Sequence, residues 1–300
     1  MVSRRTRTFA AFTLAVVAAA ACSGLPGGPR ATPDAPVKPL SHAQYQARLT
    51  AASAVLGDAL DQVARAGSPD VLGAALTATA LAGPRAANML GEALAPPDVY
   101  ESAGHLVQRM RLLGDGLQIL AGQAESFSLC GGASAMSALS GLDHAKKLRE
   151  AIQEVTGHGY QVRELIPTPT PPPDRHAANG TFLLDIPNRG LGQELAIDNG
   201  NDQDALVTLV RDGAPVLALY VGSRSNVSVK GIPNGTYSMD YTQGDDWDSG
   251  LKAFTRACAF LGIDQELQFD GRNGYKVSLK VTPAGNLTTH RVSPKDYPRV

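Results

Sequence analysis

The sequence PTPTPPP at residues 167–173 separates two parts of the chain that differ in composition. Proline restricts its own backbone and cannot donate a main-chain hydrogen bond, so this run favours an extended polyproline segment. We therefore predict that residues 161–178 are a linker that keeps two domains apart. Residues 41–160 are rich in alanine and leucine, whereas residues 179–300 contain short β-branched runs between Gly, Asn and Asp. Helices followed by strands, unmixed, predict an α+β chain with two domains.

The domain before the linker is predicted to be an antiparallel four-helix bundle. Apolar residues recur at steps of three and four, and four such stripes joined by short loops are typical of an up-down bundle. A capping box at Ser41 to Gln44 is the start signal of the first helix. First-turn prolines are the start signals of the second and third, in Ser68-Pro69-Asp70 and Pro96-Pro97-Asp98. The fourth stripe runs from Met136 to Val155. The pair Gly83-Pro84 predicts a kink or a break in the second helix.

The domain after the linker is predicted to be an antiparallel β-sandwich. Short segments with β-branched and aromatic residues are expected to be strands, at 181–186, 193–198, 205–211, 216–221, 226–230, 236–242, 254–260, 275–282 and 287–292. Residues with turn chemistry, such as Asp212-Gly213 and Pro233-Asn234-Gly235, separate several of them. Short strands at regular spacing with such turns indicate a sandwich or a barrel.

Several stretches of both domains resemble parts of exported bacterial proteins. Four segments after the linker are similar to a β-domain that recurs in such proteins, and they are LAIDNG at 195–200, DALV at 204–207, GIPNGTY at 231–237 and GDDWD at 244–248. The helical part, with Pro96-Pro97 opening a helix and Cys130 at its end, resembles actinobacterial predicted lipoproteins. Together the resemblances cover most of the mature chain. They imply export and a lipid anchor, and they imply no defined activity, catalytic residue or ligand.

Residues 1–21 are predicted to be a signal peptide, which is removed in the mature protein. Arg4, Arg5 and Arg7 form a basic start, and the apolar run that follows is too short to span a bilayer. The run ends in Ala19-Ala20-Ala21-Cys22, which resembles the lipobox of bacterial lipoproteins, so Cys22 is expected to be acylated. Ala19 stands where Leu or Val is usual, which leaves plain cleavage at an Ala-x-Ala site as the alternative. Both general secretion and twin-arginine export remain open.

The expected location is the extracytoplasmic side of the cell membrane, with Cys22 as the anchor. Two or three acyl chains together hold a protein firmly on a bilayer. Residues 22–40 are rich in Pro, Gly and Ala and are predicted to be a disordered tether. Removal of residues 1–21 takes away three arginines and no acid, which leaves 24 basic and 28 acidic residues. This weakly acidic balance excludes nucleic acid as a partner, because such a partner requires a basic patch.

Cysteine usage predicts one bond inside the folded region. If Cys22 is acylated, Cys130 and Cys258 are the remaining thiols, and both lie in an oxidising compartment. Within one chain they can pair only with each other, which would connect the end of the third helix to a strand. Two buried free thiols or a bond between chains are the alternatives.

An acidic cluster around a tryptophan is the candidate binding site. Asp245, Asp246 and Asp248 flank Trp247, and an exposed Trp offers a stacking surface for a sugar while carboxylates bind hydroxyls or a cation. The alternative is a solvated turn with Trp247 packed against the edge of the sandwich. If it is exposed, Trp247 is the residue expected to contribute most to binding a partner.

No sequence signature of an enzyme is present. A nucleophile elbow, a zinc helix, a phosphate loop and a dinucleotide fingerprint are all missing from the sequence, so no catalytic residue, metal ligand or cofactor is expected. We expect a non-catalytic envelope protein that binds another exported protein or a cell-wall polymer. The alternative is a carrier that holds a small lipid-like ligand in an Ala-lined groove of the helical bundle.

Overall fold

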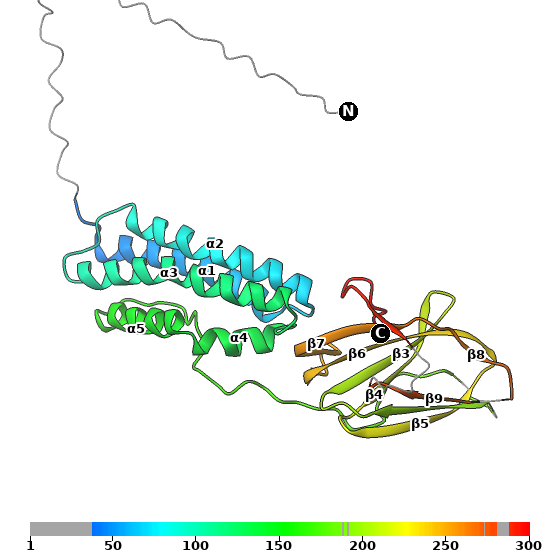
Figure 1. Cartoon of the computed structure of the whole chain (residues 1–300). Coiled ribbons are helices and arrows are strands. Elements are labelled where there is room, and N and C mark those ends of the chain that lie inside the picture. Colours follow the sequence, from blue (N-terminus) through cyan, green and yellow to red (C-terminus); the bar gives the residue numbers. More distant parts are fainter. Residues whose placement is uncertain (1–37, 188, 191, 273, 281–287) are drawn as a thin grey trace, which may run out of the picture. The chain divides into compact units, whose positions relative to one another are not determined.

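The computed structural model describes residues 38–300 except 188, 191, 273 and 281–287 (Figure 1). The predicted signal peptide, Cys22 and the predicted tether up to residue 37 lie outside the described residues. Lys38–Val300 form one compact unit, in which helices are followed by mostly antiparallel sheets. The predicted α+β order of elements is therefore present. None of the helices in the described part combines the length and hydrophobicity that crossing a bilayer requires.

The first two helices begin at the predicted start signals, whereas the third begins at Tyr100, after a turn that follows Pro96. The three helices are α1 (His42–Ala64), α2 (Pro69–Gly91) and α3 (Tyr100–Glu125). The capping box of α1 is formed, since Gln44 N donates to Ser41 Oγ at 3.3 Å and Ser41 N donates to Gln44 Oε1 at 2.9 Å. The apolar stripes form the helical core.

The predicted fourth helix is two helices, so the described residues contain five helices where the sequence predicts four. They are α4 (Gly132–Gly141) and α5 (Asp143–Gly157). Leu142 between them is extended, with φ −69° and ψ 143°. Its apolar side chain fits the helical stripe, which conceals the break. Gly141 before it has a low helix propensity, and Asp143 after it suits the positive end of a new helix.

The expected break at Gly83-Pro84 does not occur, because α2 continues through Pro84. A proline at 84 cannot donate to the carbonyl of Ala80, four residues earlier. That carbonyl faces α3, where a Cβ added at Gly114 would lie 2.8 Å from Ala80 O. Likewise, a Cβ added at Gly83 would lie 2.5 Å from Met110 O. The two glycines therefore permit close backbone contact between α2 and α3.

Alanine at Gly83 is expected to destabilise the protein by about 1–3 kcal/mol, because the new methyl group overlaps the α3 backbone. Gly104 on α3 is the matched control, since a Cβ there meets no atom within 4 Å. Gly104→Ala is expected to raise the free energy of unfolding by about 0.5–1 kcal/mol, because alanine has a higher helix propensity than glycine. Urea unfolding followed by circular dichroism measures both. An equal effect of the two changes would refute the close approach.

The strands form two sheets. The larger has the order β1-β4-β3-β6-β7-β10, with β8 also paired to β6, and the smaller has the order β5-β2-β9. The strands are β1 (Phe182–Leu184), β2 (Gln193–Asn199), β3 (Asp204–Arg211), β4 (Ala214–Val221), β5 (Ser225–Ile232), β6 (Gly235–Asp248), β7 (Ala253–Ile263), β8 (Leu267–Phe269), β9 (Tyr275–Ser278) and β10 (Thr289–Arg291). Nine correspond to predicted strands, and β8 was not predicted. The pairing of β2 with β9 is parallel, which departs from the predicted antiparallel arrangement.

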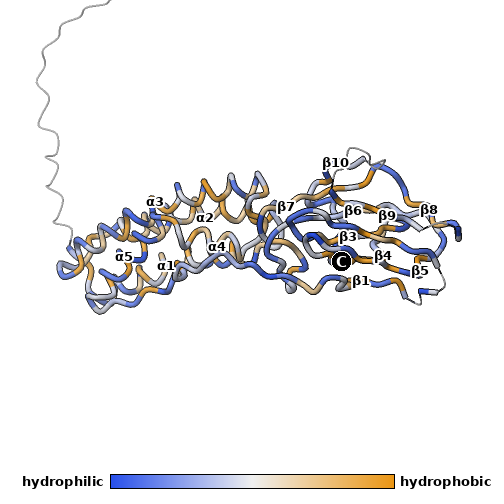
Figure 2. The backbone as a smooth tube through the Cα atoms, turned by 60° about the horizontal axis from the view of Figure 1, so that its bottom comes forward, coloured by the Kyte–Doolittle hydropathy of each residue, from blue (hydrophilic) through white to orange (hydrophobic). Residues whose placement is uncertain are grey.

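The larger sheet is apolar on both faces. One face shares a core with the smaller sheet, and that core includes Leu195 and Ile197 of β2 and Val207 and Leu209 of β3. The other face carries a second cluster, with Leu206, Ala218, Tyr220, Trp247, Phe254, Cys130 and Cys258. Hydrophobic residues accordingly recur along the strands as well as the helices in Figure 2. The segments that pack against this second face form the candidate site described below.

Residues 161–178 contain no helix or strand, as their prolines predict, but they are bonded to both the helices and the strands. Leu165 and Ile166 are buried in the helical core. Arg163 forms ion pairs with Asp58 at 3.0 Å and with Asp61 at 2.7 Å, both on α1. The later part of the segment binds the larger sheet, as described next.

Candidate functional site

The segment between α3 and α4 pairs with β7. Ala257 N donates to Ser128 O at 3.1 Å, and Cys130 N donates to Thr255 O at 2.7 Å. Phe127 and Ala257 have φ values of 60° and 51°, in the left-handed region that costs free energy for residues other than glycine. We call residues 127–134, β7, the end of β6 and residues 173–178 the junction, because there the helical part meets the strands.

The junction contains the predicted cysteine pair. The sulfur atoms of Cys130 and Cys258 are 2.23 Å apart, and their Cα atoms are 6.4 Å apart. Both residues are buried. The pair is therefore at disulfide distance, and 128 positions separate its members in the sequence.

A buried carboxylate that binds an arginine is the second connection across the junction, after the cysteine pair. Asp246 on β6 has no exposed surface, and it accepts hydrogen bonds from Arg175 Nε and Nη2, both at 2.7 Å. Thr255 Oγ1 donates to the same carboxylate and is itself 2.6 Å from Ser134 Oγ on α4. A chain of polar contacts thus runs from α4 through β7 and β6 to the linker.

The charged groups in this series of polar contacts neutralise one another. Burial alone would raise the pKa of Asp246, but the hydrogen bonds from Arg175 and Thr255 hold that pKa below its usual value. The pKa of Arg175 is raised, chiefly by its hydrogen bond to Asp246. Arg175 Nη1 also donates to Asp248 Oδ2 at 2.9 Å. Two of the three acids predicted to bind a sugar or a cation thus hold the cationic side chain of Arg175.

Of the two interpretations of Trp247, an exposed stacking surface or a ring packed against the sandwich, the structure contains the packed ring. The side chain is 4% exposed and forms edge-to-face contacts with Phe254, at 5.0 Å between ring centroids, and with Tyr220, at 5.4 Å. The alternative, a tryptophan packed against the sheet, is what the structure shows. A shift in register between Gln243 and Asp245 interrupts the regular alternation of β6 at this point. No pattern in the sequence reveals that shift.

A histidine and a buried aspartate form a further polar cluster, which the sequence analysis missed. Asp204 on β3 accepts hydrogen bonds from His176 Nδ1 at 2.5 Å, from the Tyr220 hydroxyl and from Ser223 N at 2.7 Å. The bond to Asp204 raises the pKa of His176. In the part of the chain that the structure describes, no Ser, Thr or Cys side chain bonds to His176. The cluster ties residues 174–178 to the sheet.

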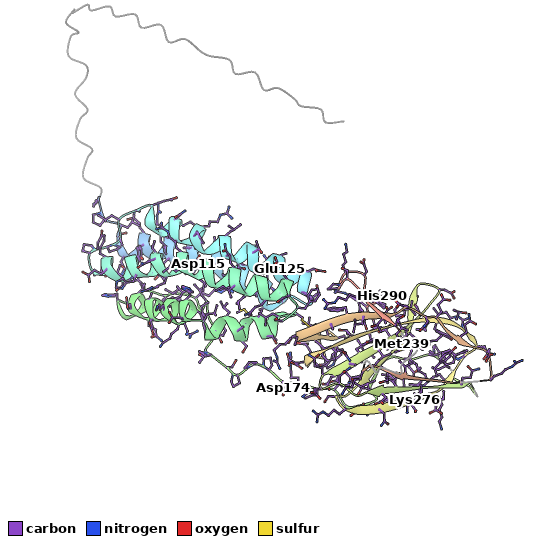
Figure 3. All side chains as sticks on the ribbon, viewed as in Figure 1. Asp115, Glu125, Asp174, Met239, Lys276 and His290 are labelled. Atoms are coloured by element: carbon purple, nitrogen blue, oxygen red, sulfur yellow. A yellow bond between two sulfur atoms is a disulfide. The ribbon has the colours of Figure 1, made fainter. Side chains whose placement is uncertain are left out.

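Asp174, labelled in Figure 3, lies on the segment that leads from the helices to the strands. Its Oδ1 is 3.7 Å from both His176 Nε2 and Arg256 Nη2. Arg256 Nη1 donates to Pro173 O at 2.7 Å, and Arg256 Nε is 3.7 Å from Asp245 Oδ2. Asp245, the third acid of the predicted site, therefore also faces an arginine. Among the described residues, no group of three or more His, Cys, Asp or Glu is arranged to hold a metal ion.

A groove on the helices is the second candidate site. It has a volume of about 760 Å³ and is open to solvent along α2, and its lining includes the small residues Gly73, Ala74 and Ala78. Leu81 lines one side and is 69% exposed. Asp70 and Glu125 are the acidic residues of its lining. The groove can accept an extended apolar segment or chain.

Comparison of the chain with known protein families gives no match, and no curated protein and no solved structure matches it either.

Proposed function

We propose that this chain is a non-catalytic lipoprotein of the bacterial cell envelope that binds another exported protein or a cell-wall polymer. The basic and apolar leader and the Ala-Ala-Ala-Cys sequence at residues 19–22 support export and acylation of Cys22. The proposal includes a location on the extracytoplasmic side of the membrane. It also includes a helical bundle and a β-sandwich as the two parts of the fold, since each part has a core of its own.

The observation that carries the binding proposal is the open apolar groove on α2. Leu81 is a large apolar side chain with 69% of its surface exposed, and glycine and alanine residues line the groove with it. Contiguous exposed apolar surface of this kind marks interaction sites in soluble domains. Leu81 can enter a pocket of a partner, and the small residues allow the partner's backbone to approach closely.

The junction supports a scaffold role. The buried carboxylates of Asp246 and Asp204 bind Arg175, His176 and hydroxyl groups of the same chain. Such a network positions surfaces and does not leave these carboxylates available to a substrate. A scaffold that holds the helical part to the strands would present the groove in a fixed orientation.

The alternative function, a carrier that holds a small lipid-like ligand in an Ala-lined groove of the helical bundle, would use this same open groove, because the helical core has little room for a ligand. Core positions such as Leu49, Leu56, Leu72, Leu106 and Leu113 are fully buried against one another. The α2 and α3 backbones are in contact at Gly83 and Gly114, which leaves little room between those helices.

The proposal is tested by cross-linking in the native host followed by affinity capture of the wild type and of Leu81→Asp. A partner that uses the groove is expected to be recovered with the wild type and to fall at least fivefold with the variant, because an aspartate cannot enter an apolar pocket. Ile119→Asp is the matched control, since Ile119 is 59% exposed on α3 and does not line the groove. A Cys22→Ser variant tests the anchor by its release from the membrane fraction.

Equal recovery of the same partner with Leu81→Asp and with Ile119→Asp would contradict the groove as the binding surface. Retention of Cys22→Ser in the membrane fraction, together with an unacylated N-terminal peptide in the wild type, would contradict the lipid anchor.

A further inference from the structure

A small cavity lies on the outer face of the larger sheet, separate from the α2 groove. It has a volume of about 110 Å³. Its lining comes from three places: residues 67–69 at the start of α2, strands β3, β6 and β7 with the turn before β7, and residues 294–300. Pro69 is the residue that it shares with the groove.

The walls of the cavity are mainly apolar and include three aromatic rings. Phe254 and Phe260 on β7 and Tyr297 line it, with Leu206 beside them. The rings of Phe260 and Tyr297 are in edge-to-face contact, with 5.6 Å between their centroids. The Tyr297 hydroxyl is already bonded to Leu206 O, so this ring presents an apolar surface. Walls of this kind accept a hydrocarbon ring or a branched aliphatic group.

Two residues with hydroxyl groups line the same cavity, and neither side chain donates to another group among the described residues. Ser68 and Thr242 are each 5% exposed. Ser68 stands at the N-cap position of α2, where a serine usually bonds to the helix backbone, but its side chain forms no such bond. Both hydroxyl groups are therefore able to donate a hydrogen bond into the cavity. A ligand with acceptor oxygens would accept these hydrogen bonds.

The charged side chains of the lining are basic, and they outnumber the one carboxylate there, that of the main chain at Val300. Lys252 and Arg299 line the cavity, and its lining includes no Asp or Glu side chain. Lys252 Nζ donates to Val300 O at 3.5 Å, whereas the exposed Arg299 side chain has no ion-pair partner in the described ranges. The start of α2 also presents the positive end of a 23-residue helix. This combination favours an anionic group at the cavity.

We propose that this cavity binds a small apolar carboxylate, with its hydrocarbon group between Phe254, Phe260 and Tyr297. The carboxylate accepts hydrogen bonds from Ser68 and Thr242 and pairs with Arg299. An apolar cavity of about 150 Å³ holds a benzene molecule. A cavity of about 110 Å³ therefore suits a branched chain of four or five carbons, or a ring inserted in part. The site is independent of the proposed docking groove.

The test uses the purified mature protein and isothermal titration calorimetry with 3-methylbutanoate and benzoate. Saturable binding with one site per chain is expected for at least one of them. Acetate, which lacks the apolar group, and benzamide, which lacks the charge, are expected to bind at least tenfold more weakly. Arg299→Gln and Thr242→Val are each expected to weaken binding at least fivefold. Arg291→Gln on β10 is the matched control, since Arg291 is exposed and does not line the cavity.

Lack of saturable binding of both carboxylates would overturn the proposal, and so would equal binding of benzamide and benzoate. Equal affinities of Arg299→Gln and Arg291→Gln would place the ligand elsewhere and would also overturn it. Arg299 is on the surface, so this comparison remains decisive if Thr242→Val fails to fold. The groove variant Leu81→Asp is expected to bind the carboxylate like the wild type, which separates this result from the proposed function.

Discussion

Simultaneous replacement of Cys130 and Cys258 by serine is expected to lower the free energy of unfolding by about 2–5 kcal/mol. The bond joins residues 128 positions apart, so it removes many conformations from the unfolded chain. It also holds the segment after α3 against β7, where Phe127 and Ala257 adopt left-handed backbone conformations. Loss of the bond therefore acts on the unfolded state and on the junction.

Guanidinium unfolding of the wild type and of the double variant, each with and without reductant, measures this effect. Reductant is expected to bring the wild type to the midpoint of the variant and to leave the variant unchanged. Mass spectrometry of a non-reduced digest checks the bond directly. Alkylation of both thiols without reductant would show that the bond is not formed, and a midpoint equal to that of the wild type would show that it adds no stability.

Methionine at Arg175 is expected to cost about 3 kcal/mol at pH 7, because Asp246 would remain buried without its cation. The methionine keeps the apolar part of the side chain, so the change removes mainly the charge and its hydrogen bonds. Arg224→Met is the matched control. Its partner Asp202 is 79% exposed, and little change in stability is expected there. The urea midpoint of Arg175→Met is therefore expected to lie clearly below that of Arg224→Met. Equal midpoints would contradict the stabilising role of the Arg175 charge.

The same pair predicts a dependence of stability on pH. The pKa of Asp246 is lower in the folded protein than in the unfolded chain, where an aspartate has a pKa of about 4. Its stabilising effect is therefore present above about pH 4 and is lost as the pH falls through the lowered folded value. Asp246→Asn is expected to flatten the stability profile in that acidic range. Parallel profiles of the wild type and this variant would contradict the expectation.

Local signals predicted most of the elements. The capping box at Ser41 and the alternation of apolar residues identify helices and strands because they depend on neighbours in the sequence. The break at Leu142 was missed because an apolar residue fits the stripe on either side of it. The three-residue strand β8 is too short to show a pattern. The parallel pairing of β2 and β9 depends on distant contacts, which periodicity does not report.

The candidate sites could be predicted only in part. The count of thiols predicted the pairing of Cys130 with Cys258, with free thiols and a bond between chains as alternatives. The partner of Asp246 is Arg175, 71 positions away, and no count or spacing indicates it. The sequence placed acids beside Trp247 without showing that a shift in register buries the ring and the Asp246 carboxylate. The cavity near Phe260 combines residues from three distant segments, and no spacing in the sequence connects them.

The cysteine pair also changes the outcome of a proteolytic cut in the proline segment. Because residues 167–173 lie between Cys130 and Cys258, the segment belongs to a closed covalent ring. A protease that cuts one peptide bond in it opens the ring and leaves two polypeptides that remain joined through sulfur. The strands would then stay attached to the helical part of the molecule, and their release would require a reducing agent as well as a protease.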